Sequence, residues 1–226
     1  MTLSVAIRLR LSPIFELNCS FEAPPGFTVL FGPSGAGKTS VLDCIAGLRK
    51  PDSGRIAIGE RLFDSAANVN LLPAARRLAY VFQDLALFPH MTVLENLRYG
   101  ISGKNGTGLP EARELLSQFG IAHLADRRPG EASGGERQRV ALARSLITNP
   151  RALLLDEPLS ALDRATRTKI IEDLRHWNEA HRVPIVYVTH SQREALAVGE
   201  RLLLMESGKI VARGAPAELL SGEDWE

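Results

Sequence analysis

The 226 residues of this chain are 45% hydrophobic and 23% charged, with a formal net charge of +1. That composition is ordinary for a domain with a buried core, and the near-neutral charge excludes a general attraction to nucleic acid or anionic lipid. Two cysteines, Cys19 and Cys44, are too few for a disulfide framework, and no run approaches the roughly 18 apolar residues of a membrane span, so any membrane role requires a partner.

Strand patterns dominate the N-terminal third of the chain. Alternating polar and apolar residues predict a β-hairpin at 5–11 and 14–21. A short apolar run ending in glycine predicts a buried parallel strand at 27–32, and the residues after it have helical character until Gly47. Further strand patterns follow at 55–63 and at 78–83.

The character of the sequence changes after Gln83. From residue 85 to 149 we expect helices and loops, including a glycine-rich loop at 102–108. Strand patterns return at 151–157, 184–190 and 201–214, the last as a hairpin, and a helix is expected at 165–181. The whole chain, 1–226, then forms one domain, with an α/β core of residues 1–84 and 150–226 interrupted by a helical subdomain at 85–149.

A complete phosphate-binding motif, GPSGAGKT, stands between the predicted strand and helix. Its glycines let backbone N–H groups turn toward an anion, Lys38 can reach the β- and γ-phosphates, and the Thr39 hydroxyl can bind Mg²⁺. A simple glycine-rich turn is the alternative, which the complete motif in this setting disfavours. The predicted nucleotide-binding residues are Gly32, Pro33, Ser34, Gly35, Ala36, Gly37, Lys38, Thr39 and Ser40.

Polar residues end three predicted strands, and open α/β sheets bind ligands at such ends. Asp156 is placed to hold Mg²⁺, while Glu157 can orient or deprotonate a water. Gln83 can contact Mg²⁺ or the attacking water, and His190 ends its strand in the same manner. Each residue alone could be a solvated strand end, but their convergence beside a phosphate loop favours a catalytic role.

A second glycine pair occurs in the segment EASGGERQR. Ser133 and Glu136 have the spacing of a capping box, so a helix should begin at Gly134. Val140, Ala143 and Ile147 recur at helical spacing and should face inward. We expect the polar side chains of the helix to be mostly solvated, with some of them paired: Arg137, Gln138, Arg139 and Arg144. Local physics alone favours a capped surface helix, and the alternative is that Ser133, Gly134 and Gly135 bind an anion.

These motifs occur in the order found in the ATP-binding cassette ATPases, which the chain resembles. The family's Walker A, Q-loop and signature motifs are resembled by GPSGAGKT, Gln83 and ASGGE, respectively. Its Walker B, D-loop and H-loop motifs are resembled by LLLDEP, SALD and His190, respectively. The resemblance implies a P-loop NTPase core with an antiparallel β subdomain and an inserted helical signature subdomain. The family's signature usually begins with leucine and ends with glutamine, where this chain has Ala132 and Glu136.

The family resemblance also implies site roles and a head-to-tail homodimer that holds two Mg-ATP molecules between its subunits. Ser133, Gly134, Gly135 and Glu136 would face the nucleotide of the other protomer, and Asp163 would lie at the dimer seam. Glu157 would be the general base, and His190 would contact the γ-phosphate. The catalytic residues would also include Lys38 and Gln83. The Mg²⁺ ligands would be Thr39, Gln83 and Asp156. The candidate for stacking on adenine is Phe15.

The segment FQDLALFPHMTVLENLRYG, residues 82–100, resembles importer ATPases, particularly those for molybdate. Sulfate, iron, polyamine and sugar importers share much of it, so the solute stays open. Such ATPases lie at the cytoplasmic face of the inner membrane, where they bind permease subunits. A solute-binding protein delivers the solute to the permease. Importers of this group often continue into a regulatory domain, which we do not expect in these residues because they end at SGEDWE.

Two other classes of protein remain as alternatives. A soluble cassette ATPase acting on a nucleoprotein would need basic patches or large insertions, which the charge and length disfavour, and we expect no nucleic acid partner. A P-loop kinase would need an acceptor pocket and has no use for ASGGE.

Overall fold

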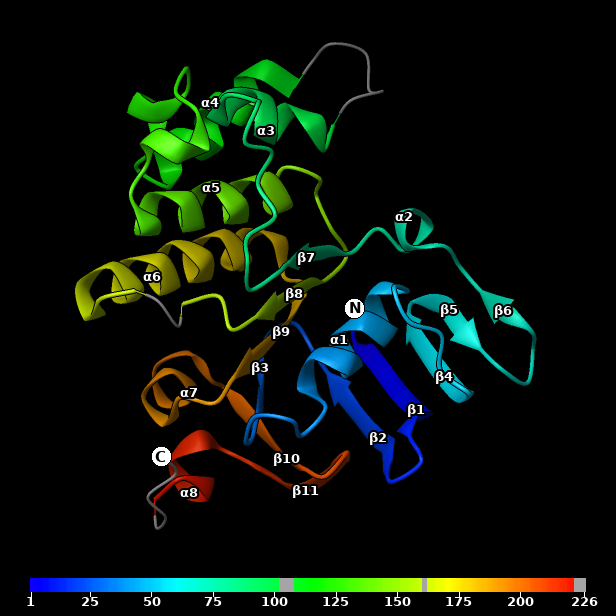
Figure 1. The fold of residues 1–226 in the computed structure, drawn as a ribbon. Coiled ribbons are helices and arrows are strands. Elements are labelled where there is room, and N and C mark those ends of the chain that lie inside the picture. Colours follow the sequence, from blue (N-terminus) through cyan, green and yellow to red (C-terminus); the bar gives the residue numbers. More distant parts are fainter. Residues whose placement is uncertain (102–107, 160–161, 222–226) are drawn as a thin grey trace. The chain divides into compact units, whose positions relative to one another are not determined.

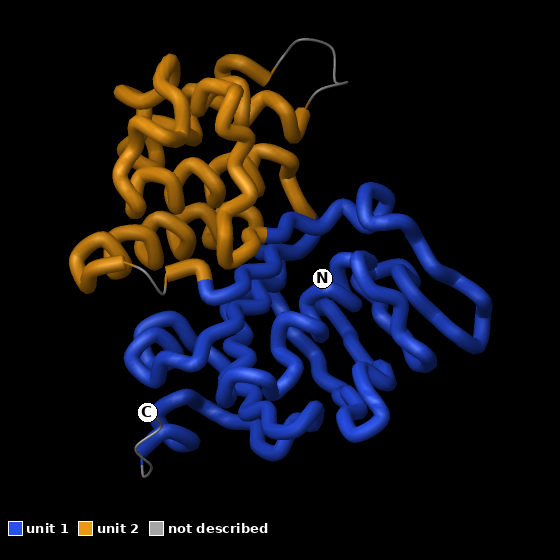
Figure 2. Tube along the Cα trace, viewed as in Figure 1, with its two compact units in different colours: residues 1–80, 151–157, 182–226 blue, residues 81–150, 158–181 orange. Residues whose placement is uncertain are grey.

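The computed structural model describes residues 1–101, 108–159 and 162–221 (Figure 1). Outside these residues lie most of the loop predicted at 102–108, Ser160 and Ala161 of the SALD motif, and residues 222–226 of the last segment. The described chain divides into two compact units (Figure 2). Unit 1 comprises residues 1–80, 151–157 and 182–226, and unit 2 comprises residues 81–150 and 158–181.

An antiparallel sheet with strand order β2-β1-β4-β5-β6 forms one part of unit 1. Its long hairpin obeys the predicted alternation, because inward residues such as Val5 and Phe21 pair across the strands while their neighbours are exposed. The hairpin prediction is confirmed. The strands are β1 (Leu3–Ser12), β2 (Phe15–Ala23), β4 (Ser53–Ile58), β5 (Glu60–Asp64) and β6 (Val69–Asn70).

The second sheet has the order β11-β10-β3-β9-β8-β7. Strands β10, β3, β9 and β8 are parallel, and β9 lies between β3 and β8, so the ends of these two strands lie at the same edge of the sheet. The strands are β3 (Gly26–Phe31), β7 (Ala79–Val81), β8 (Leu153–Asp156), β9 (Pro184–Thr189), β10 (Arg201–Glu206) and β11 (Lys209–Gly214). All but β7 match the predicted strands closely, and β7 is shorter because Phe82 and Gln83 have left the ladder.

Helix α1 (Lys38–Ala46) packs into the core that both sheets of unit 1 share. Val41, Leu42 and Ile45 are fully buried there with residues of β1, β4, β8 and β9. The helix ends at Gly47, whose φ of 84° is a left-handed conformation that glycine adopts without strain. The core therefore fixes the phosphate-loop end of α1.

Four short elements of unit 1 were not predicted from the sequence. They are β6, α2 (Pro73–Arg76), α7 (Gln192–Val198) and α8 (Pro216–Leu219). The three helices have at most seven residues, so they do not show the two full turns of periodicity from which a helix can be recognised. The strand β6 has two residues, which is too short to show alternation.

Unit 2 is helical, as expected for residues 85–149. Helices α3, α4 and α5 contact one another pairwise, and Leu97, Leu116 and Val140 are buried among them. Residues 158–181, which we expected in the α/β core, group with these helices through α6. The elements are α3 (Val93–Tyr99), α4 (Gly108–Gln118), α5 (Gly134–Leu146), α6 (Arg164–His181) and the 3₁₀ turns at Ala122–Leu124 and Pro129–Glu131.

Helix α5 begins at Gly134 as predicted, behind a complete capping box of Ser133 and Glu136. Val140 and Ala143 are buried, but the expectation that Gln138 is solvated was wrong, because only 5% of it is exposed. Gln138 shares a helix face with Leu142 and Ser145, one and two turns further on, and both are also buried. The buried face of α5 is therefore wider than the apolar pattern of its sequence indicates.

Among the helices that the structure describes, none is long and apolar enough to cross a membrane.

Candidate functional site

The phosphate loop follows β3 and leads into α1. Lys38 is 5% exposed, and its Nζ donates to the carbonyl oxygens of Gly32 at 2.8 Å and Pro33 at 2.9 Å. Burial lowers the pKa of Lys38, while the nearby carboxylates of Glu157 and Asp156 oppose that shift. The ammonium group thus lies under the loop and donates to two neutral carbonyl oxygens.

Glycine is required at two places in this loop. A side chain at Gly32 would meet the Met205 carbonyl oxygen at 2.1 Å, and Gly35 has a φ of 81° with open space where its Cβ would stand. In the part of the chain that the structure describes, no side chain caps the N-terminus of α1. Positive-φ glycines and an uncapped helix N-terminus are features that phosphate oxygens fit.

Phe15 lies beside the same loop. Its Cε1 atom is 3.5 Å from the position that a Cβ would occupy on Gly37, and the side chains of Leu17 and Met205 lie at 3.2 Å from that position. The ring is thus at the loop's apolar flank, next to where α1 begins. This position is compatible with the predicted contact to a base, which stays a prediction.

Asp156 ends β8 and is 5% exposed. Its carboxylate accepts hydrogen bonds from the hydroxyls of Thr39 and Tyr80, the latter at 3.4 Å. Burial raises the pKa of Asp156, and the hydrogen bonds partly offset that shift. The Tyr80 hydroxyl oxygen also lies 3.3 Å from Oδ1 of Asp43, so its one hydrogen can be donated to either carboxylate. Burial raises the pKa of the phenol, which therefore stays protonated at neutral pH.

The donor set beside the loop fits Mg²⁺. Thr39 and Asp156 bring oxygen ligands, and the described residues contain no group of three or more His, Cys, Asp or Glu side chains that could hold a metal. Mg²⁺ is usually held by one or two carboxylates together with waters and substrate phosphates. A sparse oxygen site next to a phosphate loop meets that requirement.

Glu157 and His190 lie at the ends of the neighbouring strands β8 and β9. The Nδ1 atom of His190 is 2.9 Å from Oε1 of Glu157, and the Glu157 side chain is 16% exposed while that of His190 is 53% exposed. The backbone N–H of Glu157 donates to the Val188 carbonyl at 3.0 Å. Glu157 has a φ of 46°, a left-handed conformation that costs a residue with a Cβ about 1–3 kcal/mol.

Unit 1 therefore contains the phosphate loop together with three of the four residues that the strand-end argument selected: Asp156, Glu157 and His190. Gln83 is exposed and belongs to unit 2, as do the signature residues. Its predicted contact with Mg²⁺ or water stays a prediction.

In unit 2, the signature segment and Asp163 share a hollow of about 370 Å³. Ser133 accepts from the Glu136 N–H, and the Ser133 N–H donates to Glu136 at 2.8 Å. These bonds lower the pKa of Glu136, whose second oxygen lies 3.1 Å from Nε2 of His123. The hollow is lined by Ser133, Gly134, Gly135, Glu136, Arg139, Leu162, Asp163 and Thr166.

Asp163 is held by the start of α6. Its Oδ1 accepts from the Thr166 N–H at 3.0 Å, and hydrogen bonds of this kind lower its pKa. The acidic side chain therefore stays ionised at the rim of the hollow that contains the signature glycines.

Tyr80 and Arg144 are among the polar residues whose specific contacts were missed by sequence reasoning. The signal for Tyr80 was a hydroxyl in an otherwise apolar strand. Arg144 had no signal: its guanidinium donates to the carbonyls of Leu85 at 2.9 Å and Ala86 at 2.7 Å, both residues with left-handed φ, and lies 5.4 Å from the Phe88 ring centroid.

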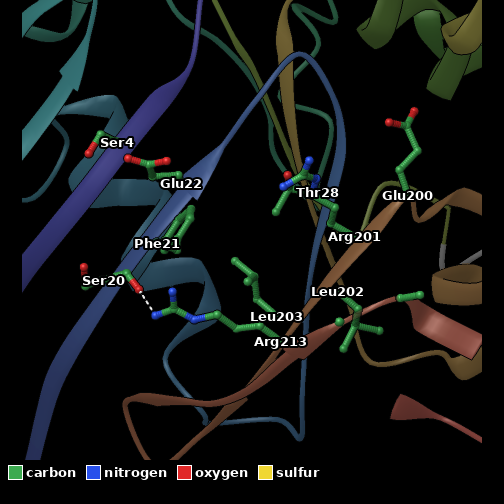
Figure 3. Close-up of a pocket in the computed structure, with 12 residues that line it drawn as sticks. Ser4, Ser20, Phe21, Glu22, Thr28, Glu200, Arg201, Leu202, Leu203 and Arg213 are labelled. Carbon is green, nitrogen blue, oxygen red and sulfur yellow. Dashed lines mark hydrogen bonds between the residues drawn. The ribbon is translucent and has the colours of Figure 1, made fainter. Parts of the chain in front are cut away.

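A larger cleft of about 690 Å³ lies elsewhere in unit 1 and contains none of the predicted site residues (Figure 3). Arg213 reaches from β11 to the Ser20 carbonyl of the β2 strand, which ties the edges of the two sheets together. The cleft is lined by Ser4, Ser20, Phe21, Glu22, Thr28, Glu200, Arg201, Leu202, Leu203, Arg213, Gly214 and Ala215.

Comparison with protein families decides the family question. The family described as ABC transporter matches residues 17–160, which include the phosphate loop, the signature segment, Asp156 and Glu157. The chain belongs to the ABC transporter family. Its resemblance to the ATP-binding cassette ATPases, predicted from six short motifs, is thereby confirmed.

Two curated relatives are named as import ATP-binding proteins. The chain is 45% identical over 224 residues to the molybdenum import ATP-binding protein ModC of Rhizobium meliloti, covering 98% of this chain and 62% of that protein. It is 44% identical over 214 residues to the molybdate/tungstate import ATP-binding protein WtpC of Archaeoglobus fulgidus, covering 94% of this chain and 87% of that one. The chain thus spans under two thirds of the length of ModC.

Solved structures of ABC transporters share the fold. The ATP-binding cassette MJ1267 matches with a TM-score of 0.84 and 25% identity, covering 98% of this chain and 95% of that chain. A bacterial Atm1-family ABC exporter with ATP bound matches with a TM-score of 0.82 and 27% identity over 99% of this chain and 40% of that chain. The predicted fold class is confirmed.

Proposed function

We propose that this chain is the ATP-hydrolysing subunit of an ABC importer for molybdate or a related oxyanion. In this proposal it lies on the cytoplasmic face of the inner membrane, bound to permease subunits that receive solute from a binding protein. Closure of a homodimer around Mg-ATP, followed by hydrolysis, would move the permease. The identities to ModC and WtpC support the choice of solute class.

One observation carries the catalytic part of the proposal. Lys38 beneath the loop, Thr39 bonded to Asp156, and Glu157 bonded to His190 all belong to unit 1. A phosphate-binding loop, a sparse metal site and a carboxylate base in one compact unit are the parts that phosphoryl transfer to water requires.

Each residue has a task that its surroundings support. Lys38 and the amides of the loop would bind the β- and γ-phosphates, and Thr39 with Asp156 would hold Mg²⁺, which neutralises phosphate charge when bound. Glu157 would accept a proton from the attacking water, and His190 would orient Glu157 and contact the γ-phosphate. Gln83 would contribute to the metal and water contacts, and Phe15 would stack on adenine.

The hollow of unit 2 would serve the second protomer. Ser133, Gly134 and Gly135 would offer a hydroxyl and N–H groups to the γ-phosphate held by the partner's loop, with Asp163 at the seam between subunits. Glu136 is already engaged by Ser133 and His123, so its role would be to hold the segment's shape.

A co-purification experiment tests the cellular role. The tagged chain is isolated from solubilised membranes of its native cells, and bound proteins are identified by mass spectrometry. We expect permease subunits with membrane spans. Recovery of the chain from the soluble fraction alone, with nucleic acid or a nucleoprotein, would instead support a non-transport ATPase.

An uptake experiment tests the solute. Cells that carry the wild-type chain or Lys38→Ala as their sole copy are given labelled molybdate, tungstate, sulfate or ferric iron. We expect the variant to lose uptake of molybdate or tungstate and to keep the others. Loss confined to another solute would replace the oxyanion assignment and leave the importer role in place.

A further inference from the structure

Tyr80 occupies a position between two carboxylates of unit 1. Its hydroxyl oxygen is 3.3 Å from Oδ1 of Asp43 and 3.4 Å from Oδ2 of Asp156. The ring sits in β7, the strand beside β8, and is half-buried. A phenol has one hydrogen, so Tyr80 donates to one of the two carboxylates at a time.

The contacts continue onto helix α1. Asp156 also accepts from the Thr39 hydroxyl, and Thr39 and Asp43 are four residues apart on α1, where side chains share a face. The contacts thus run from Thr39 through Asp156 and Tyr80 to Asp43, and the first and last of these residues lie about one turn apart on α1. Asp156 is contacted by two hydroxyls, those of Thr39 and Tyr80.

We propose that Tyr80 is a positioning residue for the divalent cation of the nucleotide site. Its hydroxyl turns the Asp156 carboxylate toward Thr39 before the cation binds, and passes its hydrogen bond to Asp43 once Asp156 is engaged. The inference rests on the proposed function, because it deepens the assignment of Asp156 as a metal ligand.

The physical basis is the scarcity of donors around a buried carboxylate. Asp156 is 5% exposed, and among the described residues its side-chain donors are Thr39 and Tyr80, so losing the Tyr80 hydroxyl leaves Thr39 to orient the carboxylate. Outer-shell partners of metal ligands typically change metal affinity by about 10–100-fold. The two Tyr80 contacts lie at the long end of the hydrogen-bond range, so we expect about tenfold, the lower end of that effect.

The experiment separates metal affinity from nucleotide affinity. Binding of a non-hydrolysable ATP analogue is measured by calorimetry in EDTA, and Mn²⁺ binding to the nucleotide complex is measured by electron paramagnetic resonance. We expect Tyr80→Phe to lower Mn²⁺ affinity about tenfold, as outer-shell changes do, while the metal-free nucleotide affinity stays within about twofold of wild type.

Tyr187→Phe is the matched control. Tyr187 lies on β9, and its hydroxyl donates to Glu194 at 3.1 Å instead of to a metal-site carboxylate. The control removes the same atom from the same sheet, so both affinities should stay at wild-type values. Equal losses of both affinities in Tyr80→Phe, or an unchanged Mn²⁺ affinity, would overturn the proposal.

A double-mutant cycle with Asp43→Ala tests the transfer of the hydrogen bond. If Asp43 acts only as a distant charge, Asp43→Ala changes Mn²⁺ affinity by the same factor in the wild-type protein and in Tyr80→Phe. If Asp43 receives the Tyr80 bond, the effect of Asp43→Ala shrinks in the Tyr80→Phe background. If Tyr80→Phe fails to fold, Asp43→Ala must weaken Mn²⁺ binding more than Asp43→Asn, which keeps an acceptor oxygen without the charge, and equal effects would overturn the transfer. If the wild-type protein bound no nucleotide, that result would contradict the proposed function itself.

Discussion

Glu157 Oε1 lies 2.9 Å from His190 Nδ1, and this contact joins the ends of two neighbouring parallel strands. The contact with the His190 ring restricts the orientation in which the Glu157 carboxylate can meet a water molecule. Glu157 follows the last residue of β8 with a left-handed backbone, and it contacts His190, whereas Asp156 contacts Thr39 and Tyr80. Two successive carboxylates can therefore take different tasks.

Glu157→Gln should keep ATP binding and slow hydrolysis at least about a hundredfold, because general-base catalysis contributes roughly 10²–10⁴-fold. Glutamine keeps the shape and the contact with His190 but accepts no proton. Light scattering with Mg-ATP should show a trapped dimer. A variant that stays monomeric and hydrolyses ATP normally would remove Glu157 from the base role.

Lys38→Ala should weaken ATP binding about 10- to 100-fold, since a hydrogen bond to a charged group is worth about 1.5–3 kcal/mol. The ammonium lies beneath the loop with two carbonyl contacts, so its loss also leaves these oxygens without that donor. Calorimetry is the measurement, and Lys169→Ala, which removes an exposed lysine paired with Asp173 on α6, is the control. Unchanged ATP affinity would contradict the phosphate role.

Ser133→Arg should leave ATP binding by the monomer intact and abolish hydrolysis, because the bulky cation would occupy the hollow proposed for the partner's γ-phosphate. The same change also breaks a helix cap. Thr92→Arg is the matched control, since Thr92 and Glu95 form an equivalent capping box on α3. Hydrolysis that persists in Ser133→Arg, or that is lost equally in both variants, would leave the capped-helix interpretation standing.

Arg144→Lys should destabilise the fold by about 1–3 kcal/mol, because lysine cannot reproduce a planar fork that reaches two carbonyls at once. Leu85 and Ala86 both hold left-handed conformations, and Arg144 is the side chain that binds their oxygens. Urea denaturation followed by circular dichroism measures the change. Arg113→Lys on the exposed side of α4 should be neutral, and equal stability of the two variants would show that the fork is dispensable.

The two free thiols predict how stability depends on alkaline pH. Burial raises the pKa of Cys19 and of Cys44 from 9.0 to about 12. Above pH 9 the unfolded chain releases protons that the folded chain retains, so stability is lost as pH rises from 9 to 12, by up to about 1.4 kcal/mol per pH unit for each thiol. Denaturation midpoints measured across this range test the slope.

Replacing both cysteines by alanine gives the control for that slope, which should become shallower. The native thiols should also resist a disulfide reagent at pH 8 until the protein unfolds. Rapid labelling of the native protein would contradict the burial of these groups.

Local signals in the sequence predicted much of this structure. The capping box of Ser133 and Glu136 involves residues three apart, so the start of α5 follows from the sequence with no knowledge of the rest. The meeting of Asp156 with the phosphate loop follows from the rule that parallel strands end at one edge of a sheet. Glu157 and His190 are brought together by the same rule.

Contacts between distant residues were out of reach of the sequence. Arg144 binds carbonyls 58 and 59 residues earlier, and Tyr80 binds a carboxylate 76 residues later. Gln138 was expected in solvent because amides usually are, and tertiary packing buried it. No local pattern encodes which partner a polar side chain will meet.

The left-handed backbone at Glu157 has a consequence for protein engineering. Glycine and asparagine adopt this conformation more readily than glutamate does, so either would relieve strain of about 1 kcal/mol or more. A library screened for heat resistance alone would therefore enrich substitutions at position 157 and, with them, loss of the proposed base. Thermostable variants of this protein should be selected for phosphate release and heat resistance together.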